Sequence, residues 1–194
     1  MTPARSLDIR AGVLIPVMRK GRLEVAMENK EKNRSMLNAV RHGDIEKIKA
    51  ILEEEPGYLH KMTPFGSWLH IAASAGQQMI AEYLIDQGID ININGGVSGG
   101  SPLNAAAQEG QREMVCFLIK NGALFDTSEP ERNALFSAIY DGHTDIARIL
   151  VEAGIDTSVK YTGQSMKNMG ALEFAKERGH AETIAYMEMV AKLA

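Results

Sequence analysis

Ten residues decide the fold, Ser67–Gly76, which read SWLHIAASAG and are followed after two residues by a second apolar run, Met79–Gly88. The first run suits a helix that begins after Ser67, because a serine hydroxyl can cap the free N–H groups of a helix N-terminus. Gly76 suits the end of that helix, where the backbone often becomes left-handed. The second run spaces paired apolar residues four positions apart, which is the pattern of a helix with one buried face. The stretch therefore predicts a helix, a tight turn and a second helix.

The same pattern occurs five times along the chain. The glycines expected to end the first helix of each copy are Gly43, Gly76, Gly110, Gly142 and Gly179. They are separated by steps of 33, 34, 32 and 37 residues. A regular step of this length is typical of repeat proteins, whose units bury their apolar faces only by stacking on one another.

The chain resembles the ankyrin-repeat family over about residues 35–190. Ser67–Gly76 stands where the family has Thr-Pro-Leu-His-x-Ala-Ala and a glycine, and Ser101–Ala106, which reads SPLNAA, is nearly as close. The resemblance implies an all-α ankyrin-repeat solenoid of stacked helix-turn-helix units joined by short hairpin fingers. The copies then fall at about residues 34–62, 63–96, 97–128, 129–165 and 166–194.

The repeats also depart from the family pattern. The residues that replace the family's proline are Trp68, Ala134 and Ala171, and those that replace its histidine are Asn104, Phe136 and Glu173. We expect these changes to weaken the local hydrogen bonding and capping while leaving the repeat spacing intact. The first and last copies are the most degenerate, as expected of end caps with one side in solvent.

A basic leader, residues 1–33, is expected to precede the repeat domain at 34–194. Residues 1–34 contain eight Lys and Arg against four Asp and Glu, a balance of +4, which leaves −8 for the rest of a chain whose total is −4. We expect the leader to be peripheral to the folded repeats.

The leader holds one apolar run, residues 11–18, that has to be weighed as a signal or membrane segment. It contains Pro16 and is far shorter than the roughly 20 apolar residues of a membrane-spanning helix. We therefore expect no transmembrane segment. Residues 13–18 and 23–27 are expected to pair instead as a short hairpin, and Met27 is a candidate alternative start of the natural chain.

The chain offers little that suggests catalysis or metal binding. Its single cysteine, Cys116, excludes an internal disulfide and is expected to be a packed thiol. His70, His143 and His180 occupy repeat positions where a structural role is expected, and no pair of histidines has metal-ligand spacing. Gly95–Gly100 lacks the Gly-Lys-Ser/Thr of a phosphate loop and is expected to be a long finger. We expect no enzyme activity, cofactor, metal or small-molecule substrate.

The resemblance implies that a partner binds on the concave side, which the first helices and the fingers form. The variable contact positions of the family, together with an insertion at residues 159–170, predict the binding residues. These are Arg41, His42, Trp68, Gln108, Glu109, Arg132, Tyr140, Asp141, Tyr161, Lys167, Glu177 and Arg178. Trp68, Arg132 and Tyr140 are the expected anchors, because Trp, Tyr and Arg most often dominate protein interfaces.

These observations predict a protein–protein interaction module that binds another protein as an adaptor, an inhibitor or an immunity-like regulator. The chain also resembles small bacterial-type ankyrin-repeat proteins. We expect a cytoplasmic monomer, since a lone cysteine suits a reducing compartment. The alternative is a tether to nucleic acid or a membrane surface through the basic leader, which would bind in a strongly salt-dependent way. Nucleic acid is the less favoured partner.

Overall fold

The computed structural model describes residues 17–163 and 166–193. The chain divides into two compact units, Met1–Ser35 and Met36–Ala194, which are described separately. Over the described residues, ten α-helices and one 3₁₀ helix account for the regular structure. They are α1 (Val17–His42), α2 (Ile45–Glu54), η1 (Pro56–His60), α3 (Trp68–Ser74), α4 (Gln78–Asp86), α5 (Pro102–Gln108), α6 (Arg112–Lys120), α7 (Ala134–Asp141), α8 (Thr144–Glu152), α9 (Ala171–Arg178) and α10 (Ala181–Leu193).

The predicted hairpin in the leader is wrong. Residues 17–42 form the single helix α1, which includes the predicted second arm at 23–27; residues 13–16 lie outside the described residues. A helix satisfies its own backbone hydrogen bonds, whereas an isolated hairpin is marginally stable in water. The Glu and Lys residues that follow Met27 are also good helix formers, and they favour a continuous helix.

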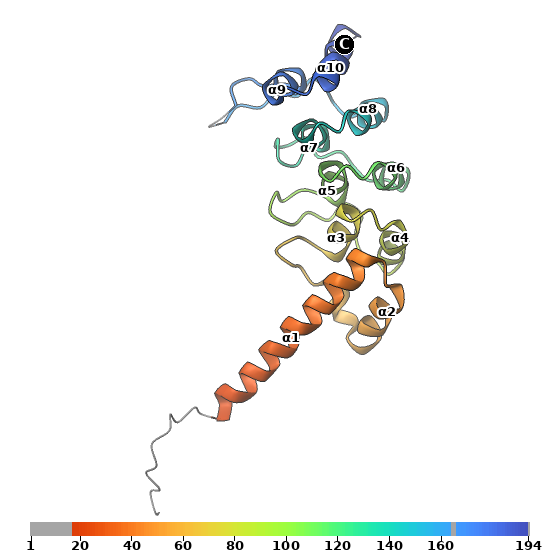
Figure 1. The fold of residues 1–194 in the computed structure, drawn as a ribbon, viewed down its shortest axis with the longest axis vertical. Helices are drawn as coiled ribbons and strands as arrows, with labels where there is room; N and C mark the ends of the chain where they lie inside the picture. Colours follow the sequence, from red (N-terminus) through yellow and green to blue (C-terminus); the bar gives the residue numbers. More distant parts are fainter. Residues whose placement is uncertain (1–16, 164–165, 194) are drawn as a thin grey trace, which may run out of the picture. The chain divides into compact units, whose positions relative to one another are not determined.

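In the unit Met36–Ala194 the helices form two columns (Figure 1). One column contains the first helices α3, α5, α7 and α9, and the other contains the second helices α4, α6, α8 and α10. The connecting segments at 61–67, 87–101, 121–133 and 153–170 are the fingers, the last of them described at 153–163 and 166–170, and the described parts project from the first-helix column. This arrangement confirms the all-α repeat solenoid. We call the surface formed by these first helices and the fingers the finger face.

Local signals in the sequence start and end these helices as predicted. The Ser101 hydroxyl accepts a hydrogen bond from the Asn104 N–H at 3.4 Å, and Asn133 Oδ1 accepts one from the Leu135 N–H at 2.9 Å. The turn glycines have the expected positive φ, for example 73° at Gly110. Gly110 has a second role, because a Cβ there would lie 2.7 Å from Cε1 of the His143 ring.

That close approach belongs to a ladder that joins successive repeats. In every repeat after the first, the residue that follows the turn glycine donates a side-chain hydrogen bond to the preceding repeat. The acceptor is the backbone carbonyl two positions before the turn glycine of that preceding repeat. The bonds are Gln77 to Arg41 at 2.9 Å, Gln111 to Ser74 at 3.1 Å, His143 to Gln108 at 3.1 Å and His180 to Tyr140 at 3.2 Å. The structural role predicted for His143 and His180 is confirmed.

The core runs between the two columns and is made of aliphatic and alanine side chains. The core includes Leu69, Leu103 and Leu135 of the first helices and Leu84, Leu118 and Leu150 of the second helices, and all six are at most 1% exposed. Cys116 differs from its predicted packing, since its side chain is exposed. It follows the buried Met114 and Val115 on α6 and lies on the opposite side of that helix, because successive residues are turned by about 100°.

Candidate functional site

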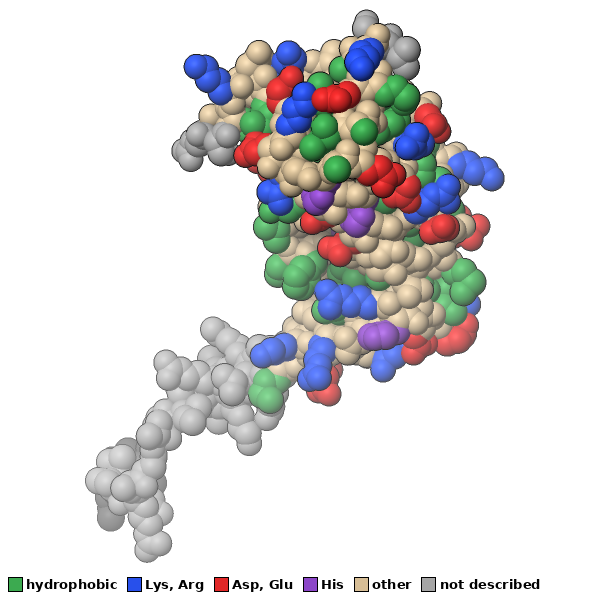
Figure 2. Space-filling view, turned by 45° about the horizontal axis from the view of Figure 1, so that its top comes forward, with side chains coloured by type: hydrophobic (Ala, Val, Ile, Leu, Met, Phe, Trp, Pro, Cys, Tyr) green, Lys and Arg blue, Asp and Glu red, His purple; other side chains and the backbone are tan. Residues whose placement is uncertain are grey.

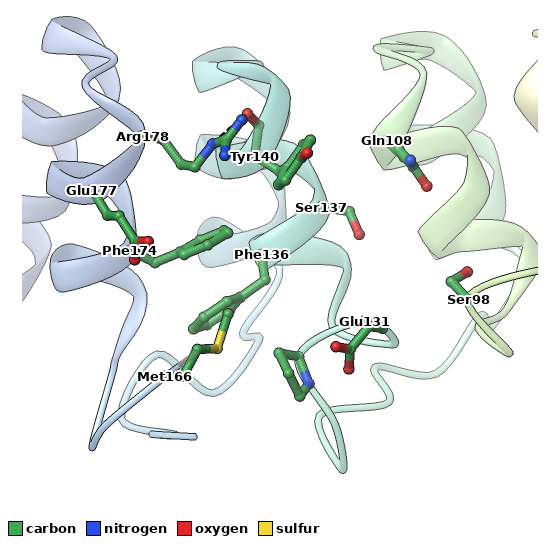
Figure 3. A pocket seen from close by; sticks show the side chains of 11 residues that line it. Ser98, Gln108, Glu131, Phe136, Ser137, Tyr140, Met166, Phe174, Glu177 and Arg178 are labelled. Carbon is green, nitrogen blue, oxygen red and sulfur yellow. Dashed lines mark hydrogen bonds between the residues drawn. The ribbon is translucent and has the colours of Figure 1, made fainter. Parts of the chain in front are cut away.

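A pocket of about 340 Å³ opens on the finger face. It draws its lining from three consecutive repeats, through α5, α7, α9 and the fingers before them (Figure 3). The lining residues are Ser98, Gln108, Pro130, Glu131, Phe136, Ser137, Tyr140, Met166, Phe174, Glu177 and Arg178. Four of these, Gln108, Tyr140, Glu177 and Arg178, are among the predicted binding residues. The structure therefore brings this part of the predicted set together in one place.

Aromatic rings form the floor of the pocket between α7 and α9. Phe136 stacks on Phe174 with ring centroids 4.9 Å apart and planes inclined by 19°, and it meets the edge of Tyr161 at 4.9 Å. Each such pair contributes about 0.5–1.5 kcal/mol beyond the burial of its surface. Phe136 and Phe174 are only 3% and 7% exposed, so the same rings pack the repeats together and line the pocket.

Tyr140 forms the rim of the pocket and is 48% exposed. The Arg178 guanidinium lies 3.8 Å from the centre of the tyrosine ring, and Arg178 Nε donates to the Tyr140 carbonyl at 3.3 Å (Figure 3). A cation over an exposed tyrosine ring contributes about 0.5–1 kcal/mol. The rim is therefore held in place by its neighbours, which lowers the conformational entropy that a partner's binding would cost.

Tyr161 was predicted to be a binding residue, and the structure corrects this prediction, because Tyr161 is buried and only 8% exposed. Its hydroxyl accepts a hydrogen bond from Asn133 Nδ2 at 2.9 Å and donates one to the Thr127 carbonyl at 2.9 Å. Burial raises the pKa of the Tyr161 hydroxyl above its usual value. The residue joins the finger at 153–170 to the finger at 121–133, so its role is structural.

Trp68 was predicted to be an anchor of the interface, and the structure corrects this prediction too, because Trp68 is fully buried. Its indole Nε1 donates to the Tyr58 carbonyl at 2.8 Å, and its ring stacks on the Tyr58 ring with centroids 5.8 Å apart and planes inclined by 17°. A partner protein cannot reach this side chain. Trp68 fills the space between α3 and the preceding η1 segment.

The remaining predicted residues lie outside the pocket. Five are exposed on the surface of the stack: Arg41, His42, Glu109, Asp141 and Lys167. Arg132, one of the predicted anchors, is half-buried, and its guanidinium lies 3.9 Å from the Asp126 carboxylate and 3.7 Å from that of Glu129. It therefore braces its own finger. Acidic and basic side chains are interspersed over the stack (Figure 2).

His70 ties one repeat to the next finger, as its predicted structural role requires. Its Nε2 donates to the Gly100 carbonyl at 2.9 Å, so Nδ1 is the acceptor for the Ser67 N–H at 3.2 Å and the Ser67 hydroxyl at 2.9 Å. Burial lowers the pKa of His70 below its usual value. The imidazole is therefore held in its neutral form.

Asn104 takes over this role in the following repeat. Its Nδ2 donates to the Glu131 carbonyl at 2.5 Å, and its Oδ1 accepts from the Ser137 hydroxyl at 2.5 Å. The expected weakening therefore does not occur at Asn104. In the next repeat Phe136 stands at the same position and replaces the polar tie with the aromatic contacts described above.

The sequence reasoning missed several lining residues, notably Phe136, Phe174, Met166 and Glu131. A usable signal was present at Phe136, because a large aromatic side chain at a position that is usually a hydrogen-bonding histidine indicates an apolar contact between repeats. The contributions of Glu131 and Met166 depend on how the fingers fold back, and no local pattern marks them.

Among the residues that the structure describes, no group of three or more His, Cys, Asp or Glu side chains is arranged to hold a metal ion. Nor does any helix there have the length and apolar character needed to cross a membrane.

Comparison with known proteins agrees with the repeat geometry. The family model described as "Ankyrin repeats (3 copies)" matches residues 36–129 and 69–161. The chain belongs to the ankyrin-repeat family. Its ankyrin repeats are the helix pairs described above, with the first helices and fingers on one face.

The curated relatives are longer proteins that contain a similar segment. The chain is 27% identical over 129 residues to ankyrin repeat and SAM domain-containing protein 6 of Rattus norvegicus, covering 63% of this chain and 14% of that protein. It is 30% identical over 177 residues to the E3 ubiquitin-protein ligase XBAT32 of Arabidopsis thaliana, covering 77% and 34%. It is 32% identical over 96 residues to the human transient receptor potential cation channel subfamily A member 1, covering 48% and 8%. The chain thus spans about a third or less of these relatives.

Proposed function

We propose that this ankyrin-repeat chain is a non-catalytic interaction module that binds a partner protein on its finger face, as an adaptor, an inhibitor or an immunity-like regulator. Ankyrin repeats are generally protein–protein interaction modules, and stacked repeats provide extended binding surfaces. One observation carries the proposal for this chain. The finger face holds five exposed large apolar side chains, which are Met62, Phe65, Val97, Leu124 and Tyr140.

The exposure of these side chains is considerable. Val97 is 94% exposed and Phe65 is 54% exposed, each on a finger, and Tyr140 is 48% exposed on α7. The fingers are anchored, since the Gly95 N–H donates to the Gly100 carbonyl at 2.9 Å and closes the finger around Val97. Clustered apolar groups with polar residues around them are typical of protein-binding surfaces. A preformed surface also limits the entropy lost on binding.

The proposal is tested by affinity purification from the native source with matched variants of the full chain. The test variant combines Phe65→Ala, Val97→Ala and Tyr140→Ala. The control combines Met79→Ala on α4 with Met189→Ala on α10, which removes apolar side chains that are 70% and 47% exposed outside the finger face. Circular dichroism and thermal melts first establish that each variant is folded.

We expect the test variant to lose a co-purifying protein that the wild type and the control retain. The same protein should bind the purified chain directly, with an affinity that falls at least tenfold in the test variant. Equal recovery with both variants, or loss from the control alone, would refute binding on the finger face.

A further inference from the structure

The pocket on the finger face has two chemically different ends (Figure 3). Phe136, Phe174 and Met166 make one end apolar, between α7 and α9. Toward α5 the lining changes to the hydroxyl of Ser98 and the amide of Gln108. An occupant that fits both ends needs an apolar group at one end and hydrogen-bonding groups at the other. A glutamine amide both donates and accepts, as peptide groups require.

Two carboxylates, those of Glu131 and Glu177, also line the pocket. Among the described residues neither forms an ion pair, whereas other acids of this region, such as Asp126 and Glu129, lie close to Arg132. The single lining cation, Arg178, is engaged by the Tyr140 ring and carbonyl. The lining side chains therefore carry two negative charges and one positive charge, and Glu177 lies beside Phe174 at the apolar end (Figure 3).

The length of the pocket along the stack indicates an extended chain. Three first helices contribute to it, and packed helices lie about 8–10 Å apart, so the lining spans roughly 16–20 Å. An extended peptide advances about 3.3 Å per residue, which gives five or six residues over that span. The volume of about 340 Å³ holds a few side chains of such a segment but little more.

We propose that this pocket binds a short extended segment of a partner protein that carries an apolar side chain next to a Lys or Arg. The apolar side chain lies on Phe136 and Phe174, and the Glu131 and Glu177 carboxylates attract the cation beside it. This inference rests on the proposed function and adds the chemical class of segment that the finger face recognises.

The experiment uses the full chain and a phage-displayed library of random twelve-residue peptides as the probe. We expect the enriched peptides to share an apolar residue with a Lys or Arg within two positions. A synthetic peptide of the enriched sequence is then titrated by fluorescence anisotropy against the wild type and three variants. These are the double variant Glu131→Gln with Glu177→Gln, and the controls Glu82→Gln on α4 and Glu152→Gln on α8, which alter exposed acids outside the pocket lining and off the finger face.

The double variant is expected to bind the peptide about fivefold to tenfold more weakly, since each exposed ion pair contributes up to about one kcal/mol. Each control should stay within twofold of the wild type. Replacing the peptide's apolar residue by alanine should weaken binding at least as much as the double variant does. The weakening caused by the double variant should also shrink as salt is raised, because salt screens exposed charges.

Several outcomes would overturn the inference. These are a library that yields no binder, enrichment of acidic peptides, an unchanged affinity in the double variant, or an equal loss in the controls. Self-association that the double variant abolishes would assign the pocket to a second copy of the chain and would also overturn it. If the native partner stays bound to the variant Glu131→Gln with Glu177→Gln but is released by the variant that combines Phe65→Ala, Val97→Ala and Tyr140→Ala, the proposed function stands and this inference fails.

Discussion

Replacing Phe136 by alanine is expected to loosen the last repeat from the stack. Phe136 belongs to α7, and its two ring contacts at 4.9 Å reach Phe174 on α9 and Tyr161 on the finger before α9. Alanine removes both contacts. The neighbouring rings cannot fully close the space, because the Tyr161 hydroxyl is fixed by its own hydrogen bonds. A cavity is therefore expected at the junction between α7 and α9.

The size of the effect follows from burial. Phe136 is 3% exposed, and replacing a buried phenylalanine by alanine costs about 3–5 kcal/mol. The whole free energy of unfolding of a natural domain is about 5–15 kcal/mol. In a repeat protein such a loss falls on one interface between neighbouring units. We therefore expect α9 and α10 to open under conditions in which α3 to α6 remain folded.

Hydrogen exchange followed by mass spectrometry measures this directly. Peptides from α9 and α10 should exchange about 100-fold to 4000-fold faster in Phe136→Ala, since each 1.4 kcal/mol corresponds to a factor of ten. Peptides from α3 to α6 should change little. The matched control is Phe65→Ala, because that ring is 54% exposed and its loss should change stability by less than about 0.5 kcal/mol. Equal effects of the two variants, or uniform loss of protection along the stack, would refute the reasoning.

Three further variants test other contacts. Tyr161→Phe should lower the free energy of unfolding by about 1–3 kcal/mol in urea titrations, because the buried Asn133 amide and the partly buried Thr127 carbonyl each lose a hydrogen bond. Tyr140→Phe on the half-exposed rim should change it by less than about 0.5 kcal/mol. Gly110→Ala should lower the free energy of unfolding by more than about 1 kcal/mol, because φ is 73° and a Cβ would meet the His143 ring at 2.7 Å. Its control is Gly57→Ala, where nothing lies within 4 Å of the added Cβ, and this variant should be nearly neutral in the same titration. The pKa of His70 is lowered in the folded chain. As the pH falls below about 6.5, the unfolded chain therefore takes up a proton that the folded chain does not. The free energy of unfolding then falls by up to about 1.4 kcal/mol per pH unit. Urea titrations between pH 7.5 and 5 should therefore show a shallower pH dependence for His70→Asn than for the wild type; parallel curves would contradict the assignment.

The helix pairs and their stacking could be predicted because the information is local. A glycine such as Gly110 marks a left-handed turn, and the apolar spacing on either side marks the buried face of each helix. The period then requires stacking, since no unit can bury its own face. The leader was harder to predict, because its alternation of short apolar runs is compatible with strands as well as with the helix α1.

The binding residues were predictable only in part, because burial on the finger face depends on the neighbouring repeat. Trp68 has the side chain of an interface anchor, but its partner Tyr58 lies ten residues earlier in η1 and buries it. Tyr161 is buried by a finger 34 residues away through Thr127. Tyr140 differs because the Arg178 guanidinium covers one face of its ring and leaves the side chain 48% exposed.

The junction between α7 and α9 connects the stability of the stack with the proposed binding site. His70 and Asn104 join their repeats to the next finger through hydrogen bonds to backbone carbonyls, whereas Phe136 does so through aromatic rings. A polar residue at this position would remove the Phe136 ring from the floor of the pocket. Because the rings that hold α9 also line the pocket, an occupant that packs on Phe136 and Phe174 adds contacts across this junction. Binding should therefore stabilise the last repeat, by about 2.7 kcal/mol when the free ligand is at 100 times its Kd.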